Sequence, residues 1–216
     1  MAEDPAGRLH AMAIELGAMA QNGLNYSTDK YELDRYRRIQ VLTADLLGLV
    51  AECEPAEFHR ALTAEVGHAT PKLDARGALF DEEGRVLLVR ELADGCWTLP
   101  GGWIDALDTP RHAAEREFAE EAGLRVRAST LAALYDGTRH NGHSTSAVMW
   151  HIYKLFFVVD RLDDDEPTAG LDGETTDVGF FPLDALPTLS TRRTTEDELR
   201  MLYRHHLDRA LPPEVD

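Results

Sequence analysis

The sequence is poor in cysteine and in basic residues, and it has no long apolar run. Cys53 and Cys96 are the two cysteines among 216 residues, and they form no C-x-x-C pair. This argues against a disulfide framework and against a cysteine-based zinc site, so we expect a protein of the reducing cytoplasm. The apolar stretch LFFVV at 155–159 is among the longest, and it is far too short to span a bilayer.

The shortage of basic residues leaves a large acidic excess. Lysine and arginine number 22 against 39 aspartates and glutamates, which gives a net charge of -17. Such a chain repels phosphate backbones and anionic lipids, which argues against nucleic acid or a membrane as its partner. Carboxylates are the preferred ligands of hard divalent cations. The first ten residues show no cationic segment followed by an apolar one, so we expect no secretory signal.

Residues 8–66 are predicted to be helical. Apolar side chains recur there at helical spacing, beginning with Leu9, Met12, Ala13 and Leu16. Gly23 and the surrounding turn formers predict the end of a first helix, and Gly67 predicts the end of a third. We therefore predict a small all-α domain over residues 1–67. A unit of this size is marginal alone, so its apolar faces need the rest of the chain or a second copy.

Residues 68–216 have the pattern of strands mixed with helices, which predicts an α+β domain. The segments 73–80 and 85–90 flank the turn DEEG and predict a β-hairpin. Further predicted strands lie at 125–135, 147–159 and 178–181.

Two helices in this second domain have clear end signals. Thr109 and Pro110 predict a start and Gly123 predicts the end of one helix. Thr195 and Glu198 predict a capping box at the start of the other.

The first of these helices carries three glutamates on one face. Glu117, Glu120 and Glu121 stand at i, i+3 and i+4, within an arc of about 100°. Like charges placed so closely weaken a helix unless a cation such as Mg²⁺ or Mn²⁺ binds between them. The alternative is a solvated acidic face that pairs with neighbouring arginines.

The residues around this helix resemble the Nudix box, G-x5-E-x7-R-E-U-x-E-E-x-G-U, in which U is a bulky apolar residue. Gly102 begins the pattern, RE-F at 116–118 and EE at 120–121 fill its centre, and GL at 123–124 ends it. Asp108 stands where the family has glutamate, and it is one methylene shorter. So many fixed positions in a row make a chance match improbable.

The resemblance implies an α/β/α Nudix sandwich with a mixed sheet, preceded by the small helical domain. It also implies that the helix carboxylates bind Mg²⁺ or Mn²⁺, with the backbone carbonyl of Gly101 as a further ligand. The residues expected to support these ligands without touching the metal are Asp108 and Arg116. The implied reaction is hydrolysis of a phosphoric anhydride, and Glu120 and Glu121 act in it through the metal.

Other parts of the chain resemble one Nudix subgroup. Residues 18–39 are similar to the helical N-terminal domain of enzymes that hydrolyse nucleoside diphosphates linked to another moiety X, such as ADP-ribose and CDP-choline pyrophosphatases. Residues 74–80, 139–143 and 174–194 also resemble this subgroup. We therefore expect a small nucleoside diphosphate derivative as substrate and a homodimer as the assembly.

A general base must also lie within reach of the attacking water. In the family this residue varies and often lies on a loop outside the box. Glu174, at the end of an acidic loop, is the first candidate, and Glu120 is the second. The alternative for Glu174 is an exposed loop carboxylate without a catalytic part.

Four further residues are candidates for substrate binding. Arg76 and Arg90 could hold phosphate, or could pair with the abundant carboxylates of the chain. Trp103 could stack on a base or ribose, or could pack inside the protein. Asp105 is a candidate contact to substrate or to Arg76.

Two histidines in the segment RHNGH do not complete a zinc site. His140 and His143 have no cysteine or third histidine placed to finish a tetrahedron, so a substrate-contacting loop or plain surface histidines are better interpretations.

Two other functions share the same box. An RNA-end pyrophosphohydrolase should show a basic groove, and the net charge of -17 argues against it. A non-catalytic Nudix-fold sensor usually loses helix carboxylates or adds a DNA-binding module, whereas Glu117, Glu120 and Glu121 are all present here.

Overall fold

The computed structural model describes residues 5–51, 54–137, 150–171 and 173–216, and these form two compact units. The helical unit lies within residues 1–72 and includes residues 150 and 151. The second unit consists of residues 73–137 and 152–216. The segment that contains His140 and His143 lies outside the described residues, so the interpretation of these histidines stays a prediction.

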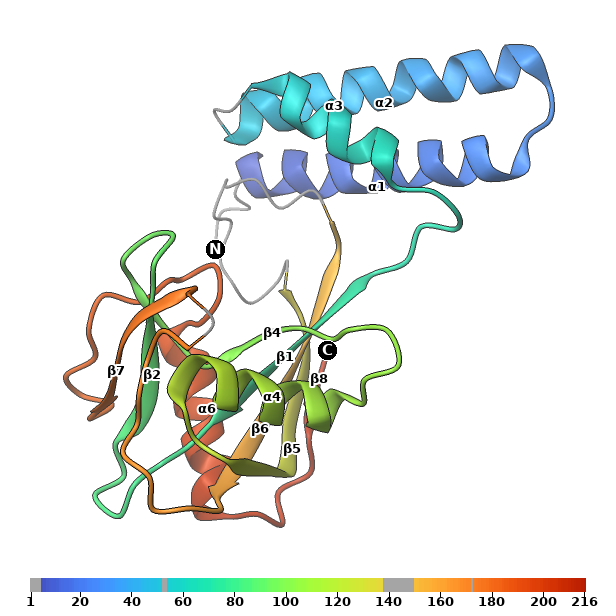
Figure 1. The fold of residues 1–216 in the computed structure, drawn as a ribbon. Coiled ribbons are helices and arrows are strands. Elements are labelled where there is room, and N and C mark those ends of the chain that lie inside the picture. Colours follow the sequence, from blue (N-terminus) through green and yellow to red (C-terminus); the bar gives the residue numbers. More distant parts are fainter. Residues whose placement is uncertain (1–4, 52–53, 138–149, 172) are drawn as a thin grey trace. The chain divides into compact units, whose positions relative to one another are not determined.

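The helical unit contains α1 (Pro5–Tyr26), α2 (Lys30–Ala51) and α3 (Pro55–Ala64) (Figure 1). The predicted break within residues 21–29 is confirmed, because α1 ends at Tyr26 and α2 begins at Lys30, although Gly23 itself lies inside α1. A Cβ atom at Gly23 would lie 2.4 Å from the ring of Tyr36 on α2. Gly23 therefore allows the two helices to approach closely, and helix packing outweighs the low helix propensity of glycine.

The core of this unit is small, and one face of α1 stays open. Its buried apolar residues are Ala13, Ala44, Leu47, Phe58 and Leu62. On α1 the large side chains expected to pack are instead exposed; they are Leu9 (43%), Met12 (42%), Leu16 (40%) and Met19 (52%). This exposed set is called the α1 apolar face below.

The second unit contains two sheets. The larger has the order β4-β1-β6-β5-β8 and comprises β1 (Lys72–Ala78), β4 (Gly101–Trp103), β5 (Val126–Asp136), β6 (Ile152–Arg161) and β8 (Glu214–Val215). The pair β5 and β8 is parallel, whereas β1 with β4 and β5 with β6 are antiparallel, so the sheet is mixed. The smaller sheet has the order β3-β2-β7, with β3 (Trp97–Thr98), β2 (Val86–Glu91) and β7 (Thr175–Phe181).

The predicted hairpin of residues 73–90 forms only at its turn. Phe80 bridges Val86, but β1 and β2 then separate into different sheets. The strand β1 lies between β4 and β6, and β2 lies between β3 and β7. The partners β4 and β6 of β1, and the partner β7 of β2, are distant in sequence, so a local pattern cannot show these pairings.

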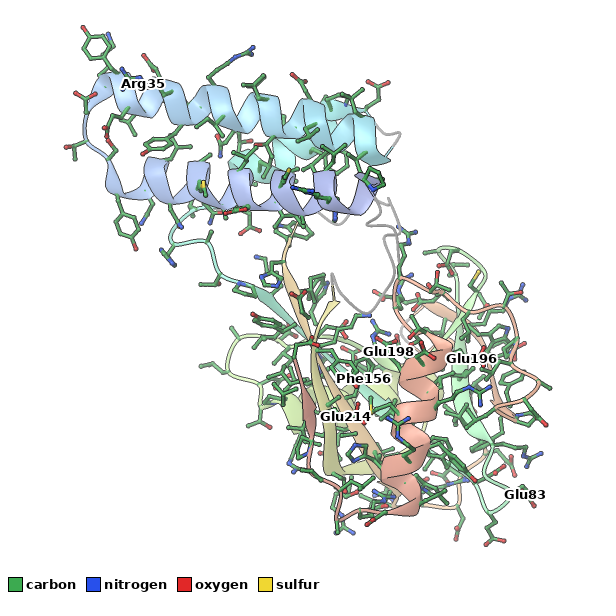
Figure 2. The ribbon with its side chains drawn as sticks, turned by 180° about the vertical axis from the view of Figure 1, so that it is seen from behind. Arg35, Glu83, Phe156, Glu196, Glu198 and Glu214 are labelled. Carbon is green, nitrogen blue, oxygen red and sulfur yellow. The ribbon has the colours of Figure 1, made fainter. Side chains whose placement is uncertain are left out.

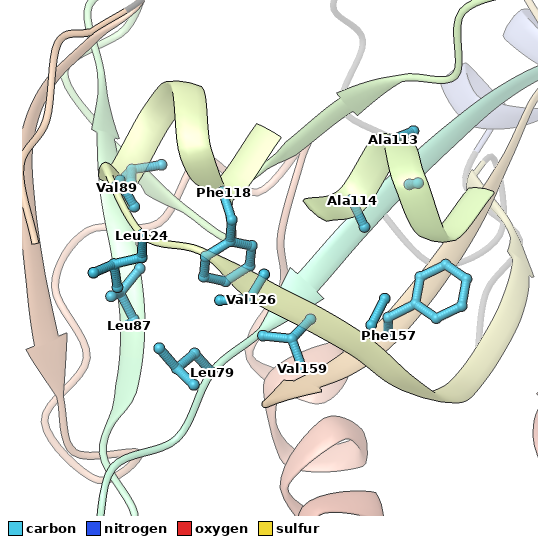
Figure 3. Packing of buried hydrophobic residues seen from close by; sticks show 13 residues of the cluster. Leu79, Leu87, Val89, Ala113, Ala114, Phe118, Leu124, Val126, Phe157 and Val159 are labelled. Carbon is cyan, nitrogen blue, oxygen red and sulfur yellow. The ribbon is translucent and has the colours of Figure 1, made fainter. Parts of the chain in front are cut away.

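Helices α4 (Pro110–Ala122) and α6 (Glu196–Leu207) pack with different sets of strand residues. Leu87 and Val89 pack in one cluster with Phe118 of α4 (Figure 3). The alternate residues Val86 and Leu88 pack in a second cluster with Leu199 and Leu202 of α6. Successive strand residues point to opposite faces, so the two helices cover opposite faces. This confirms the predicted α/β/α sandwich.

The predicted helix ends are confirmed. The Thr109 side chain accepts a hydrogen bond from the backbone N–H of His112 (3.2 Å), and Gly123 ends α4 with a φ of 68°. Thr195 and Glu198 form the predicted capping box of α6.

Candidate functional site

The site begins where β4 meets α4. Gly101 has a φ of 149°, and a Cβ atom there would lie 2.3 Å from the carbonyl oxygen of Ala75. Only glycine fits this close approach of β4 to β1. The backbone N–H of Gly101 donates a hydrogen bond to Oε2 of Glu121 (2.9 Å), which ties the strand to the helix.

Glu121 is a buried carboxylate, 4% exposed. Burial, together with the charges of Glu117 and Glu91, raises its pKa to about 8. The hydrogen bond from Gly101 and the charge of Arg76 oppose this shift but do not cancel it. The ionised form of Glu121 is therefore destabilised in this arrangement, and a bound cation would relieve it.

Glu117 and Glu120 lie on the same face of α4, and Glu120 is the more exposed. The Glu117 side chain is 13% exposed, and a Cβ atom at Gly102 would lie 3.0 Å from its Oε1. Burial raises the pKa of Glu117, the charge of Glu120 adds to the rise, and Arg116 opposes it. The Glu120 side chain is 46% exposed.

Arg116 bridges these carboxylates. Its Nη1 lies 2.9 Å from Oε1 of Glu117 and 2.7 Å from Oε2 of Glu120. Its Nη2 donates to the carbonyl of Trp103 (3.3 Å) and lies 3.8 Å from Oδ2 of Asp105. Desolvation would lower the pKa of Arg116, but the surrounding carboxylates outweigh it and raise the pKa. Arg116 thus remains a cation.

Asp108 reaches the same cluster despite its short side chain. Its Oδ1 lies 2.7 Å from Nδ1 of His112, and its Oδ2 lies 3.5 Å from Nε of Arg116. The hydrogen bond with His112, together with the charges of His112 and Arg116, lowers the pKa of Asp108. Asp108 therefore ties the loop before α4 to the helix. The resemblance to the Nudix box implied this supporting role for the family's glutamate, whose side chain is one methylene longer.

The donor set fits a hard divalent cation in its chemistry. Carboxylate oxygens face one another on α4, and two of the carboxylates have raised pKa values, a penalty that a bound Mg²⁺ or Mn²⁺ removes. Within the described residues no three acidic, histidine or cysteine side chains already enclose a metal-sized space. Arg116 stands between Glu117 and Glu120 in this arrangement, so it has to yield Glu120 when a cation binds.

Glu174 lies beside the end of α4. Its backbone carbonyl accepts a hydrogen bond from Leu92 (2.8 Å), and the hydroxyl of the next residue, Thr175, donates to the carbonyl of Glu121 (3.1 Å). Glu174 is exposed, and its charge raises the pKa of Glu91. The structure thus brings this loop residue, 53 positions from Glu121 in the chain, to the carboxylate cluster.

The two predicted phosphate-binding arginines differ in their surroundings. Arg76 is 4% exposed, and Nε and Nη2 donate to the Asp74 carboxylate at 3.0 and 2.9 Å. Its Nη1 donates to the Thr98 hydroxyl and the Leu99 carbonyl. Arg90 is exposed and donates through Nε to the carbonyl of Gly95 (2.8 Å). Arg76 therefore pairs with a carboxylate, and Arg90 faces the β2–β3 turn.

Trp103 and Asp105 are both accessible. Trp103 is 48% exposed at the end of β4, and the side chain of Asp105 is 76% exposed. Asp105 approaches Arg116, whereas the carboxylate paired with Arg76 is that of Asp74.

Sequence reasoning missed three buried charged residues. Glu91 (7% exposed) ends β2, and Lys154 (4%) lies on β6. Glu198 (1%) lies in the first turn of α6 and is labelled in Figure 2. Burial raises the pKa of Glu91 and of Glu198 and lowers that of Lys154 to about 8. For Glu91 and Lys154 the available signal was a single charge that interrupts an apolar strand; Glu198 was predicted only as part of the capping box.

Comparison with known proteins accounts for both units. Residues 70–203 match the model of the NUDIX domain. The chain belongs to the NUDIX family. Residues 8–62 match a second model, the UDP-X-like, N-terminal oligomerisation domain, so the resemblance to this subgroup is confirmed. Among the described helices, none is both long and apolar enough to cross a membrane.

Several relatives resemble most of this NUDIX chain. It is 36% identical over 191 residues to the proposed ADP-ribose pyrophosphatase YjhB of Bacillus subtilis (strain 168), covering 88% of each chain. A crystal structure of an ADP-ribose pyrophosphatase from Streptococcus suis 89-1591 is 34% identical, with a TM-score of 0.60 over 68% of this chain and 100% of that one. A crystal structure of a UDP-X diphosphatase matches with a TM-score of 0.60 over 98% of this chain and 99% of that one. Its sequence identity is 24%, so the match shows the shared fold. The chain is thus a hydrolase that acts on pyrophosphate bonds.

Proposed function

We propose that the protein uses a divalent metal to hydrolyse the pyrophosphate bond of a nucleoside diphosphate linked to another moiety X. The products are a nucleoside monophosphate and X-phosphate. The observation that carries this proposal is the set of α4 carboxylates facing the glycine backbone of β4, with Glu121 bound to Gly101.

Glu117, Glu120 and Glu121 are the residues that would hold Mg²⁺ or Mn²⁺, with the carbonyl of Gly101 as a further ligand. The metal, when bound, neutralises the pyrophosphate and lowers the pKa of a coordinated water. Arg116 orients Glu117, and Asp108 orients Arg116.

The general base is Glu174, with Glu120 as the second candidate. Glu174 precedes Thr175, whose hydroxyl is bonded to the end of α4, and it is exposed to the incoming water. The nucleobase or the ribose of the substrate stacks on the exposed ring of Trp103. The exposed carboxylate of Asp105 accepts hydrogen bonds from substrate hydroxyls.

ADP-ribose is the first substrate to test, and CDP-choline is the second. Two relatives above 30% identity carry ADP-ribose pyrophosphatase in their names. The nucleobase and X are recognised by loops, which differ between relatives of one fold.

The assembly we propose is a homodimer. The α1 apolar face is open in the single chain, and the N-terminal residues match an oligomerisation domain. A second copy of the same helix pair is the natural cover for this face, since a two-fold interface places the same surface on both subunits.

The proposal is tested by phosphate release with a coupled phosphatase. The panel comprises ADP-ribose, CDP-choline, a UDP-sugar, NADH and diadenosine polyphosphates, each with Mg²⁺, Mn²⁺ or EDTA. Nucleoside triphosphates, which the phosphatase attacks directly, are tested with inorganic pyrophosphatase in its place. Metal-dependent turnover of at least one diphosphate–X compound is expected. Turnover confined to nucleoside triphosphates would contradict the proposal.

A further inference from the structure

The substrate of the proposed reaction carries a diphosphate, and arginine is well suited to hold phosphate oxygens. Two arginines close to the carboxylate cluster are already engaged. Arg76 is buried and donates to Asp74, Thr98 and Leu99. Arg116 pairs with the α4 glutamates. These two arginines therefore have few donors left for phosphate, and Arg90 uses its Nε on the carbonyl of Gly95.

Arg193, on the segment between β7 and α6, reaches the same region. Its Nε lies 3.2 Å from Oε1 of Glu91, and its Nη1 lies 3.3 Å from Oδ2 of Asp94 and 3.2 Å from the Ser190 hydroxyl. These contacts use Nε and Nη1, whereas no contact within the described residues engages Nη2. The side chain is 31% exposed. Arg193 is thus oriented by its partners and still has donors that face outward.

Glu91 links Arg193 to the carboxylate cluster. Glu91 on β2 pairs with Thr175 on β7, and the Thr175 hydroxyl donates to the carbonyl of Glu121 (3.1 Å). The neighbouring Leu92 donates its backbone N–H to the carbonyl of Glu174. Arg193 therefore contacts a residue whose strand neighbours bind the backbone of the proposed base and of a proposed metal ligand.

Buried polar groups fix the segment that carries Arg193. The Lys154 ammonium donates to the carbonyls of Arg192 (3.2 Å) and Arg193 (2.7 Å). The Thr194 hydroxyl is 0% exposed, lies 2.9 Å from that of Thr98 and accepts from the backbone N–H of Leu99 (3.1 Å). These hydrogen bonds from buried Lys154 fix the backbone of residues 192–193 and so restrict the position of the Arg193 side chain. Less conformational entropy is then lost when an anion binds to Arg193.

We propose that Arg193 binds the diphosphate of the substrate through its outward-facing donors. This inference rests on the proposed function, because it concerns the same site. A purely structural role predicts something different: an ion pair with buried Glu91 contributes to stability and adds nothing to anion affinity.

The test uses inorganic pyrophosphate as the probe, in titration calorimetry with Mg²⁺. We expect the full-length wild type to bind it and Arg193→Ala to bind at least about tenfold more weakly, the loss of a charge-assisted hydrogen bond. Arg193→Lys should fall between them, because lysine keeps the charge without the planar fork. Arg209→Ala is the matched control: Arg209 pairs with Asp160 at 3.1 Å and is 34% exposed.

Kinetics and thermal unfolding separate binding from structure. For a diphosphate–X substrate, Arg193→Ala should raise KM at least about tenfold, whereas Arg209→Ala should leave KM unchanged. The Tm of Arg193→Ala should also fall, because buried Glu91 loses its partner. Equal pyrophosphate affinity in wild type and Arg193→Ala would overturn the proposal, as would a lowered Tm with unchanged KM, or no pyrophosphate binding by the wild type. Arg193-dependent pyrophosphate binding without turnover of any panel compound would support the anion site and refute the proposed function.

Discussion

The backbone N–H of Gly101 donates to Oε2 of Glu121 across a strand-to-helix contact that only glycine permits. This hydrogen bond joins the first residue of β4 to the last glutamate of the Nudix box. The hydrogen bond holds the Glu121 carboxylate in a buried position, where its negative charge is destabilised. A cation bound beside Glu121 would remove this penalty.

Glu120→Gln removes a proposed metal ligand that contributes little to the fold. We expect kcat to fall by at least about 100-fold, the low end for losing part of a proton-transfer and metal site. Thermal unfolding should change little, because the ion pair from Glu120 to Arg116 is exposed. The control is Glu196→Gln, which breaks the exposed pair with Arg200 on α6. Near-full activity of Glu120→Gln would remove Glu120 from the metal site.

Leu107→Gly should stabilise the protein. Leu107 has a φ of 76° and a fully exposed side chain, so it adopts a left-handed conformation without packing to offset the strain. We expect the free energy of unfolding to rise by about 0.5–1 kcal/mol. This is the backbone strain that glycine removes, minus the cost of the greater flexibility that glycine gives the unfolded chain.

Urea unfolding measures this change, with Leu162→Gly as the comparison. Leu162 is 53% exposed and has an ordinary negative φ, so its replacement should destabilise. A loss of stability in Leu107→Gly equal to that in Leu162→Gly would show that the left-handed conformation carries no strain.

Lys154 should make stability depend on pH in the alkaline range. Burial lowers its pKa from 10.5 to about 8, so between these values the unfolded chain binds a proton that the folded protein does not. The free energy of unfolding therefore rises as the pH rises through this window and is lowest below it. Each pKa unit corresponds to about 1.4 kcal/mol, so the rise is a few kcal/mol at most.

Urea unfolding of wild type and Lys154→Met across this pH window measures the Lys154 contribution as the difference between the two curves. Lys154→Met lacks the titrating group, so the wild type should gain stability relative to it as the pH rises. Parallel curves would mean that Lys154 keeps its ordinary pKa in the folded protein.

Leu16→Lys should convert the proposed dimer to a monomer. Leu16 lies in the middle of the α1 apolar face, and a charge there cannot be buried against a second copy without a large penalty. Light scattering at micromolar concentration measures the mass. Leu207→Lys, which changes an exposed leucine (68%) on α6, should remain dimeric. A monomeric wild type would refute the assembly outright.

The parts of the fold that could be predicted from the sequence depend on neighbours in the chain. The ends of α4 and α6 follow from Thr109, Gly123 and the capping box at Thr195. The shared face of the three α4 glutamates follows from helical spacing alone.

The parts that could not be predicted depend on distant partners. The predicted hairpin of β1 and β2 separates because the two strands join different sheets. Gly23 lies inside α1 because the Tyr36 ring of α2 packs where a Cβ atom would be. Glu91, Lys154 and Arg193 could not be assigned to the site from local sequence, although Glu91 and Lys154 interrupt apolar strands. Their burial or position arises only when β2, β6 and the segment before α6 come together.

The most direct measurement of the central claim is product analysis by ³¹P NMR with ADP-ribose and Mg²⁺. The account predicts equal amounts of AMP and ribose 5-phosphate, formed with the metal and absent with EDTA or in Glu120→Gln. Release of ADP and ribose, or equal turnover with EDTA, would contradict a metal-dependent attack on the pyrophosphate bond.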